Sequence, residues 1–502
     1  MSDIQTALET INAARPYTEP IDNHSDIGYT NRFCLENEST LQFVPERGTW
    51  LVNNGLGIWN EKPGGDNAAV GIAMDFAQGL ADDFKSQGKA LMESGNTDSK
   101  KAGEELVKKS SRIQQRNAVT NIVQLAKSIT PMQTPVSKLD TEPFLIGTDS
   151  GVLDIRTRQI VSGPIDSLIT RQVPVRWNPD AKCPQFEAYL QQVFKDDDDI
   201  IALMAKWLGY SLTGSTKEQK FVILYGPRGR NGKSVLLDVM RDVMGQDYFA
   251  AIDKRLLTIS RAETRFALSN LEGKRAVFAS ETNEQARLDV EFIKSFTAGD
   301  VQVAERKGVQ PYDFAPQAKL IFALNTLPYA KFDNSFRNRV IPVPMLQSFY
   351  KESDIEFQEG DLPPDKELPD KLHAEREGIF AFWVKAHDLY LNEGLTVPMG
   401  CRQLVSEFEE QNDYVSMWIT ECCDIGNDYR EKFTNLYASY RGFCERQRLP
   451  QPTRPNEFVQ RLRDEPGLAH VKPGNVSTFN GIRLMVSDSV LGWAQSRDQG
   501  AA

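Results

Sequence analysis

Short apolar runs alternate with segments of helical spacing in the middle of the chain. The runs are "FVILY" (221–225), "RAVFAS" (275–280) and "KLIFALN" (319–325). Runs of this length, with loops and helices between them, are typical of strands buried on both faces of a parallel sheet. The region from about residue 221 to 345 is therefore predicted to be an α/β core with a mainly parallel sheet.

The hydrophobic pattern is different ahead of this region. Residues 30–60 combine short apolar runs with Gly and Asn, which predicts strands and turns. Helical spacing from Asn67 to about Thr130, broken by "SGNTDSK", predicts two long amphipathic helices, and "FLIGTDSGVLDIRTRQI" (144–160) predicts strands again. Two helices are expected around the acidic run 196–199, whose carboxylates suit a helix N-terminus better than a metal site.

The pattern after the core is mostly helical. The acidic, proline-rich segment 352–369 predicts a loop, and residues 371–394 predict a helical stretch. Helices at 401–411, 433–447 and 456–465, followed by strands around a "KPGN" turn, suggest a winged helix. The predicted domains are a tail (1–30), an α+β domain (31–200), the α/β core (201–350), a linker with a helical segment (351–396) and a winged-helix-like domain (397–502).

Composition narrows the class of protein. The chain has 502 residues, 40% of them hydrophobic and 25% charged, and no apolar run long enough to cross a bilayer. With no secretory signal at its start, we expect a cytoplasmic protein without a membrane partner. Its 6 cysteines and 4 histidines form neither a zinc pattern nor a disulfide framework. The net charge of -11 argues against coating nucleic acid with the whole surface, but a local basic channel remains compatible with it.

The stretch "GPRGRNGKS" (226–234) carries the clearest chemistry. It joins an apolar strand to a helix, and Gly229 and Gly232 would let backbone N–H groups face bound phosphates. Lys233 would reach the β- and γ-phosphates of ATP, and the Ser234 hydroxyl would bind Mg²⁺. Gly226 fits the usual spacing only if the loop is one residue longer. The predicted nucleotide-binding set is Gly226, Gly229, Asn231, Gly232, Lys233 and Ser234.

Two further polar residues follow the next apolar runs. Glu281 comes directly after the second run, where a carboxylate can hold the metal's water shell and orient the attacking water. Glu284 is a weaker candidate for that role. Asn325 ends the third run and is placed to sense the γ-phosphate. The order of these three sites along the chain favours an ATP hydrolase over a chance glycine-rich turn.

The segments "GRNGKS", "ASETNEQARLDVEFIKSFTAGD", "KLIFALNTLP" and "DNSFRNRVIPVP" together resemble the superfamily 3 helicases, and closely the poxvirus-type primase-helicases of phages and plasmids. The resemblance implies an AAA+-like P-loop core that forms a hexameric ring around DNA. It also implies that residues 31–200 form a collar-like pre-helicase domain and that the chain ends in a winged helix. No paired carboxylates typical of a primase precede residue 220, so a separate primase or polymerase is an expected partner.

Further site residues are implied only by this resemblance. The arginine finger of the family lies in the segment that matches "FRNRV". Arg339 is the better match if Val340 fixes the register, and Arg337 remains the alternative. The family's DNA-contacting hairpin matches the stretch around Arg306 and Lys307, with Lys294 as a secondary candidate.

These features predict an ATP-dependent helicase that moves on single-stranded DNA and separates forked DNA during phage or plasmid replication, in the host cytoplasm if a phage encodes it. An initiator or loader that uses ATP as a switch without unwinding is the competing interpretation. A small-molecule kinase is disfavoured, because it would need an arginine-rich lid and no pore hairpin.

Overall fold

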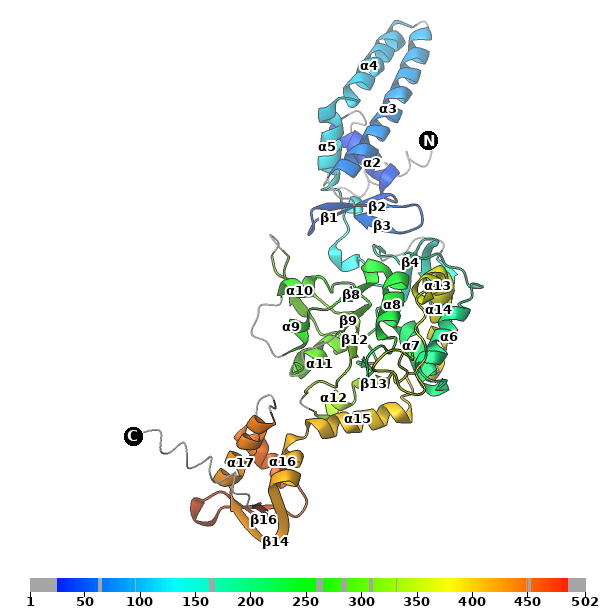
Figure 1. Ribbon diagram of the computed structural model, residues 1–502. Coiled ribbons are helices and arrows are strands. Elements are labelled where there is room, and N and C mark those ends of the chain that lie inside the picture. The colour runs from blue at the N-terminus through cyan, green and yellow to red at the C-terminus, as the bar shows by residue number, and fades with distance from the viewer. Residues whose placement is uncertain are drawn as a thin grey trace.

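The computed structural model describes residues 25–61, 66–94, 96–161, 168–258, 265–280, 287–306, 310–330, 332–447, 449 and 453–485. The chain forms three parts in a row: a projecting N-terminal arm, a central body and a C-terminal lobe (Figure 1). Across the described ranges, no helix combines the length and the apolar character needed to cross a bilayer.

A five-stranded parallel sheet lies at the centre of the body. The strand order is β13 (Val340–Pro344), β7 (Phe221–Tyr225), β12 (Lys319–Leu324), β9 (Ala276–Ser280) and β8 (Phe249–Ala251), and every neighbouring pair is parallel. The three predicted strands and their parallel arrangement are confirmed. The two edge strands, β8 and β13, were not among the predicted strands, because one has three residues and the other contains two prolines.

Both faces of the sheet are covered, which explains the uninterrupted apolar runs. In β7, Val222 and Leu224 pack into one hydrophobic cluster, and Phe221 and Ile223 pack into the other. The first face carries α6 (Pro184–Val193), α7 (Asp198–Ser211), α8 (Lys233–Tyr248), α13 (Leu368–Ala374) and α14 (Arg376–Glu393). The second carries α9 (Lys254–Leu257), α10 (Arg265–Ser269), α11 (Val290–Ala298), α12 (Asn334–Arg337) and α15 (Met399–Asn412).

The N-terminal part combines a small sheet with a helical arm. It contains α2 (Asp26–Asn37), β1 (Leu41–Val44), β2 (Thr49–Asn53), β3 (Trp59–Glu61), α3 (Asn67–Glu93), α4 (Thr97–Ile113) and α5 (Arg116–Ala126). The two long predicted helices are confirmed as α3 and α4. Our assignment of residues 30–37 to strands and turns is wrong: they lie in α2, which Ser25 caps and whose Phe33 is fully buried.

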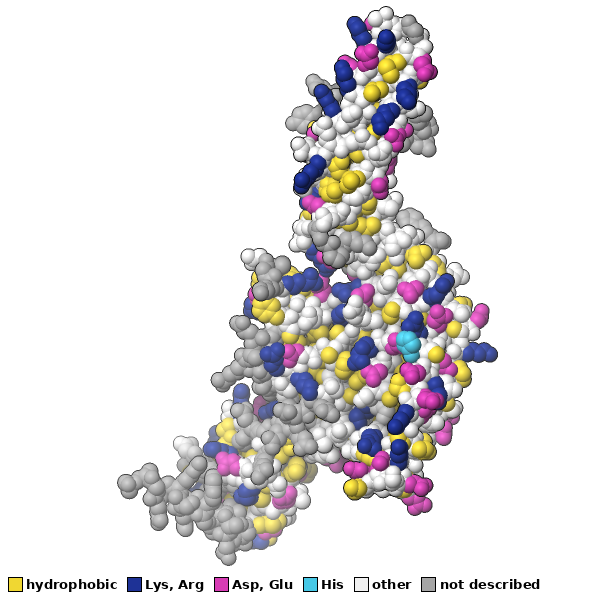
Figure 2. Space-filling model, turned by 45° about the horizontal axis from the view of Figure 1, so that its top comes forward, with side chains coloured by type: hydrophobic (Ala, Val, Ile, Leu, Met, Phe, Trp, Pro, Cys, Tyr) yellow, Lys and Arg dark blue, Asp and Glu magenta, His cyan; other side chains and the backbone are white. Residues whose placement is uncertain are grey.

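The arm of α3 and α4 depends on two glycines. A Cβ added to Gly88 would lie 2.8 Å from the carbonyl oxygen of Gly103, and one added to Gly103 would lie 2.5 Å from that of Gly88. The two helices can approach this closely only because neither position has a side chain. Basic and acidic side chains are mixed along the arm, with hydrophobic ones between them (Figure 2).

A second small sheet packs on the central body. It consists of β4 (Leu145–Thr148), β5 (Gly151–Asp154) and β6 (Gln159–Ile160), as the pattern predicted, and is preceded by two short turns at Thr130–Met132 and Val136–Lys138. Ile146 and Leu153 belong to the same hydrophobic cluster as Val222 of β7. The domain boundary predicted at residue 200 falls inside α7, and the one at residue 30 falls inside α2. Asp197 of the acidic run caps α7 by accepting from the N–H of Ile200 at 3.1 Å, as expected for helix-terminal carboxylates.

The C-terminal lobe contains α16 (Tyr414–Cys422), β14 (Cys423–Lys432), α17 (Phe433–Arg446), α18 (Pro455–Arg463), β15 (Ala469–Val471), a short turn at Pro473–Asn475 and β16 (Thr478–Leu484). The helices predicted at 433–447 and 456–465 and the hairpin around the "KPGN" turn are confirmed. The helix predicted at 401–411 also exists, but it is not part of this lobe, because Val405 and Phe408 of α15 pack against the central sheet. The first helix of the lobe is instead α16, whose apolar residues belong to the core of the lobe.

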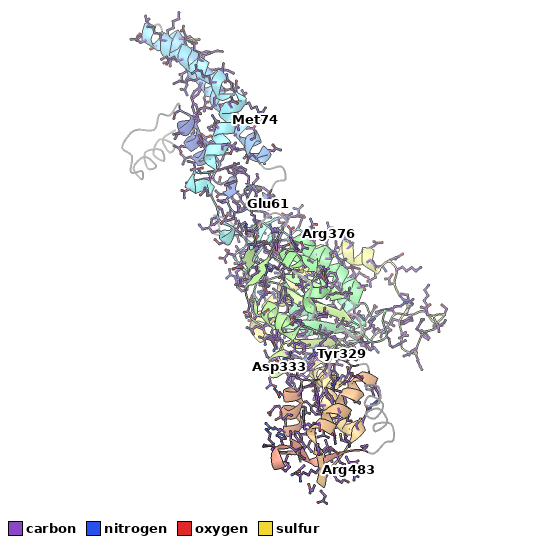
Figure 3. The ribbon with its side chains drawn as sticks, turned by 90° about the vertical axis from the view of Figure 1, so that its left-hand side faces the viewer. Glu61, Met74, Tyr329, Asp333, Arg376 and Arg483 are labelled. Carbon is purple, nitrogen blue, oxygen red and sulfur yellow. The ribbon has the colours of Figure 1, made fainter. Side chains whose placement is uncertain are left out.

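The lobe meets the central body close to Tyr329 and Asp333 (Figure 3). The rings of Tyr329 and Tyr414 lie 5.8 Å apart, and the N–H of Ala330 donates to the side chain of Asn412 at 2.7 Å. Helix α15 therefore joins the body to the lobe while packing on the body itself.

Candidate functional site

The loop between β7 and α8 has a backbone that requires glycine. Gly229, Arg230 and Gly232 have positive φ angles of 72°, 46° and 81°. A Cβ on Gly226 would lie 2.5 Å from Oδ1 of Asn231 and 2.7 Å from Nζ of Lys233. A Cβ on Gly232 would lie 2.9 Å from Val193. The loop therefore curls tightly around the Lys233 side chain, with Gly226 as part of it.

The positive end of α8 and the Lys233 ammonium point to the same concave loop. Nζ of Lys233 donates to the carbonyl oxygen of Gly226 at 3.0 Å and to Oδ1 of Asn231 at 3.3 Å. Lys233 is the first residue of α8, and Ser234 follows it with an exposed side chain. Exposed N–H groups at a helix start, together with an ammonium and a hydroxyl, suit a polyphosphate and its cation.

Asn231 supports the loop from within. It is 2% exposed, and its Nδ2 donates to the carbonyl oxygen of Gln347 at 3.0 Å and to Oγ of Ser348 at 3.1 Å. Its side chain is therefore committed to holding the loop in place, in addition to the contact with Lys233.

Asn325 lies at the same edge of the sheet as the loop. It directly follows β12, and the N–H of Gly226 donates to the carbonyl oxygen of Leu324 at 3.1 Å. Asn325 lines a cavity of about 660 Å³ together with Gly229, Lys233 and Ser234. β9 pairs with β12 in parallel, so both strands end at this edge. Glu281 and Glu284, which come after β9 in the sequence, lie outside the described residues.

The segment 346–365, here called the strap, lies against the loop, although the part from residue 352 onward was predicted only as a loop before a helical stretch. Arg228 forms a two-pronged ion pair with Asp361 at 2.7 and 2.9 Å, and Nη1 of Arg230 pairs with Asp354 at 2.8 Å. The Tyr350 hydroxyl donates to the carbonyl oxygen of Arg228 at 2.9 Å. The available sequence signal was complementary charge, with arginines at 228 and 230 and acidic residues throughout 352–361.

The ion pair with Arg228 favours the charged form of Asp361. The Arg228 guanidinium lowers the pKa of the Asp361 carboxyl, mainly through its hydrogen bonds. The Asp361 side chain is only 4% exposed, whereas that of Arg230 is 58% exposed. The first pair is thus the shielded one, and the second lies at the surface, where ion pairs contribute little.

Helix α6 supports the loop from the other side. The Tyr189 hydroxyl donates to the carbonyl oxygen of Gly232 at 2.8 Å. The carboxylate of Glu375, between α13 and α14, accepts from the N–H groups of Gln185 and Phe186 at 3.0 and 3.1 Å and so caps α6. Sequence reasoning missed both residues, because their partners are distant in the chain.

Arg337 and Arg339 lie at the opposite edge of the sheet from the loop. β13 runs parallel to β7, with Val340 beside Phe221 and Pro344 beside Tyr225. Both arginines precede β13, whereas the loop follows β7. The length of a five-residue strand, roughly 16 Å, therefore separates the arginines from the loop of their own chain.

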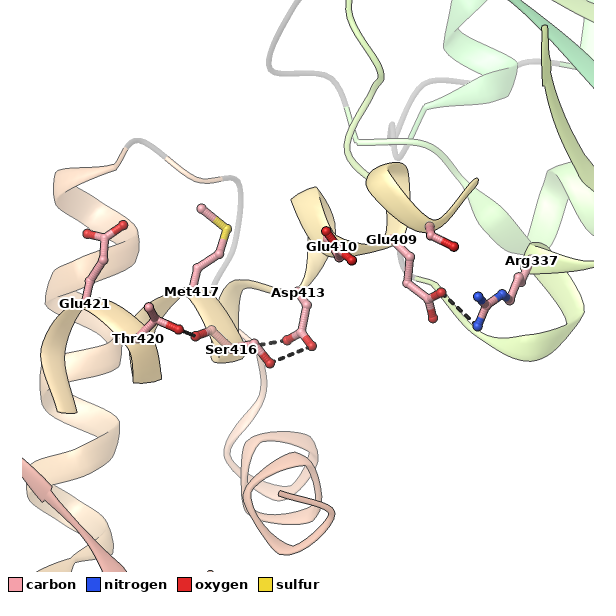
Figure 4. A pocket seen from close by; sticks show the side chains of 9 residues that line it. Arg337, Glu409, Glu410, Asp413, Ser416, Met417, Thr420 and Glu421 are labelled. Carbon is pink, nitrogen blue, oxygen red and sulfur yellow. Dashed lines mark hydrogen bonds and ion pairs between the residues drawn. The ribbon is translucent and has the colours of Figure 1, made fainter. Parts of the chain in front are cut away.

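The two arginines have different surroundings. Arg339 is half-buried and donates to Oγ of Ser335 at 2.6 Å and to Oε1 of Gln219 at 2.8 Å. Arg337 has an exposed side chain and pairs with Glu409 of α15 at 2.9 Å, at the edge of an acidic pocket beside the C-terminal lobe (Figure 4). Arg337 is therefore the more accessible of the two candidates.

The predicted hairpin is present, as β10 (Gln302–Ala304) and β11 (Tyr312–Phe314). Arg306 follows β10, and its guanidinium pairs with Glu272 at 2.6 Å, while Lys307 lies outside the described residues. Glu272 also accepts from the Tyr312 hydroxyl at 2.9 Å and pairs with Arg47 of the N-terminal part at 3.2 Å. One carboxylate thus connects the hairpin to the N-terminal part.

Lys294, the secondary candidate for DNA contact, and two arginines of α18 are held by acidic or polar partners. Lys294 pairs with Asp333 at 2.5 Å and with Glu291 at 3.2 Å. Arg461 of α18 pairs with Asp413 at 2.7 Å, which ties α18 to the start of α16. Arg463 contacts Nδ1 of His470 at 2.7 Å.

Among the residues that the structure describes, no group of three or more His, Cys, Asp or Glu side chains could hold a metal ion. Of the two predicted metal residues, Glu281 lies outside the described residues. Ser234 could hold a cation through its hydroxyl, together with phosphate oxygens and water, which is how Mg²⁺ is commonly bound beside phosphates.

Two family models and two viral proteins match parts of this chain. Residues 30–195 match the family described as D5 N terminal like, and residues 224–339, which include most of the loop, match a family of unknown function, DUF5906. The chain is 27% identical over 290 residues to the candidate helicase L207/L206 of Acanthamoeba polyphaga mimivirus, covering 55% of this chain and 30% of that protein. It is 24% identical over 260 residues to the candidate helicase 184R of Invertebrate iridescent virus 6, covering 48% and 26%. The N-terminal part of the chain is thus similar to the D5 N terminal like family, and the chain is similar to two viral proteins named as helicases.

The chain therefore spans less than a third of either viral relative. Among solved structures, the apo C-terminal region of NrS-1 aligns with a TM-score of 0.45 and 12% identity, covering 90% of this chain and 98% of that one. A second apo form of the same region aligns with a TM-score of 0.40 and 13% identity, covering 73% and 89%.

Proposed function

We propose that this chain is a Mg²⁺-dependent ATPase with an AAA+-like P-loop core of the superfamily 3 type, which forms a hexameric ring, moves on single-stranded DNA and unwinds the duplex during phage or plasmid replication. The observation that carries the proposal is the position of Lys233. It lies inside a glycine-requiring loop, at the start of α8 and at the carboxyl edge of a parallel sheet. Phosphates are favoured at such an edge by backbone N–H groups and by the helix dipole.

Each site residue then has a distinct task. Lys233 neutralises charge on the β- and γ-phosphates, and Ser234 binds Mg²⁺. Glu281 orients the attacking water, and Asn325, which lines the cavity beside Lys233, senses the γ-phosphate. Mg²⁺ supplies charge neutralisation on the transferred phosphate.

The positions of the site residues at the two edges of the sheet support assembly into a ring. Because Arg337 and Arg339 precede β13 while the loop follows β7, an arginine can complete an ATP site only if subunits place these edges against each other. An arginine finger can contribute about 10³ to 10⁵ in rate, so hydrolysis should depend on assembly. The candidate-helicase names of the two viral relatives and the D5-like match support the replication role.

The deciding experiment compares the parent chain with Lys233→Ala in ATP hydrolysis and in strand displacement on forked DNA. The parent should hydrolyse ATP and displace the strand, and the variant should do neither while melting at the same temperature. An exposed arm lysine changed in the same way, Lys89→Ala, is the control and should behave as the parent. Hydrolysis by Lys233→Ala at the parent's rate would refute the assignment of the loop. Hydrolysis and DNA binding without strand displacement by the parent would identify an ATP-switched initiator or loader instead.

A further inference from the structure

The cavity that contains the loop is lined by more than the phosphate-binding residues. It is also lined by α6, through Gln185 and Gln192, and by the strap, through Phe349 and Leu362, and the N–H of Phe349 donates to the carbonyl oxygen of Arg230 in the loop at 3.0 Å. Its volume of about 660 Å³ is in the range of sites that enclose a whole small molecule. A triphosphate at the loop would therefore leave the surface formed by α6 and the strap for the rest of the nucleotide.

The strap presents an apolar surface to the cavity. Phe349 is half-buried, and Leu362 is 36% exposed. The two residues lie side by side, because they form an isolated parallel bridge in which the N–H of Leu362 donates to the carbonyl oxygen of Ser348 at 3.1 Å. Covering exposed apolar side chains in a cavity with a flat apolar ligand lowers the free energy of the complex.

Helix α6 presents polar groups to the same space. Gln185 and Gln192 are seven residues apart, which places them on the same face of the helix about 10 Å apart. Their side-chain amides have no hydrogen-bond partner among the described residues. Tyr189, between them, is already engaged with Gly232. An amide offers both a donor and an acceptor, the combination that pairs with the edge of adenine.

We propose that the part of the cavity lined by α6 and the strap is the nucleobase subsite. The adenine ring stacks on Phe349 beside Leu362, and the amides of Gln185 and Gln192 form hydrogen bonds with its edge. The proposal rests on the proposed function, because it takes the loop as the triphosphate site. It makes the strap part of the nucleotide site and gives this chain a preference for ATP over other nucleoside triphosphates.

The test measures the affinity of the full chain for ATP, GTP and inorganic tripolyphosphate, which carries the phosphates without a base. Phe349→Ala should weaken ATP binding about tenfold, because stacking of one base on an aromatic ring is worth that much, and should leave tripolyphosphate binding unchanged. Phe349→Leu keeps apolar packing if the alanine variant folds poorly, and should show the same selective loss. Ile355→Ala, 99% exposed on the same strap, is the control and should match the parent.

The amides are tested in the same way. Gln185→Ala and Gln192→Ala should reduce the preference for ATP over GTP, with tripolyphosphate binding unchanged. Equal losses for ATP and tripolyphosphate in the Phe349 variants would mean that the strap only positions the loop, and an unchanged ATP affinity would mean that the base lies elsewhere; either result overturns the subsite. Failure of the parent to bind tripolyphosphate would instead overturn the triphosphate site itself, and the subsite with it.

Discussion

Arg228 in the glycine-rich loop and Asp361 in the strap face each other in a two-pronged ion pair, with N–O distances of 2.7 and 2.9 Å. The same guanidinium also donates to the carbonyl oxygen of Glu356 at 2.7 Å. The residues are 133 positions apart in the chain. A segment that follows the last strand of the sheet therefore holds the loop that follows β7.

This ion pair should help to hold the loop in the conformation that binds phosphate. Asp361→Asn removes the charge but keeps the shape, and should weaken ATP binding by about tenfold, since a shielded charge-assisted hydrogen bond is lost. Asp354→Asn is the matched control, because it breaks the more exposed pair with Arg230 and should change the affinity little. Equal effects of the two substitutions in a nucleotide titration would contradict the special role of Asp361.

The same pair should be insensitive to pH near neutrality. Because Arg228 lowers the pKa of Asp361 below its ordinary 3.8, the pair stabilises the fold above that value and loses its contribution only as the pH falls further. The ratio of ATP affinities between the parent and Asp361→Asn should therefore stay constant from about pH 5 to pH 8. A ratio that changes within this window would show that another titrating group controls the loop.

The arginine fingers should act between subunits. Arg339→Ala and Lys233→Ala should each be inactive alone, and mixing the two proteins should restore part of the ATP hydrolysis, because some interfaces then pair an intact loop with an intact finger. If Arg337→Ala is the inactive variant, Arg337 is the finger, which agrees with its greater exposure. Mixed rings that form but stay inactive would argue against action between subunits.

The hairpin should bind DNA without taking part in hydrolysis. Changing Arg306 and Lys307 together to alanine should leave basal ATP hydrolysis unchanged, lower the affinity for single-stranded DNA, flatten its salt dependence and abolish unwinding. Lys100 and Lys101, an adjacent exposed pair in α4, provide the control when changed in the same way. A DNA affinity that falls equally in both double variants would leave no special role for the hairpin.

The partner of Arg306 offers a second measurement. Glu272 holds Arg306, Tyr312 and Arg47, so Glu272→Gln should release the Arg306 guanidinium and raise DNA affinity. If the affinity falls instead, the carboxylate serves to position the hairpin for DNA.

His387 should make stability depend on pH. It is fully buried in α14, neither ring nitrogen has a hydrogen-bond partner among the described residues, and burial lowers its pKa from 6.5 to about 4. The unfolded chain therefore takes up a proton that the folded chain does not, and stability falls as the pH drops from about 6.5 toward 4. Between pH 7.5 and about pH 5, the melting temperature of the parent should fall more than that of His387→Leu.

The sequence by itself determined the parts of this protein that depend on neighbouring residues. The runs 221–225, 275–280 and 319–325 predicted three parallel strands, because a strand buried on both faces has to be apolar throughout. The glycines of the loop were also evident, since glycine adopts positive φ angles such as those of Gly229 and Gly232 without steric cost. Helices α3, α4, α17 and α18 followed from helical spacing alone.

Only the tertiary structure decided what lies against these elements. The acidic segment 352–369 was predicted only as a loop between domains, but its Asp361 holds the glycine-rich loop and its Leu362 lines the cavity beside it. The helix at 401–411 was assigned to the C-terminal domain, yet its buried Val405 and Phe408 pack on the sheet. A helical pattern predicts that one face is buried, but it does not predict the element on which that face packs. The sequence also does not show which opposite charges pair when they are 133 residues apart. Those pairings are set by chain topology, which brings the segment after β13 back over the loop after β7.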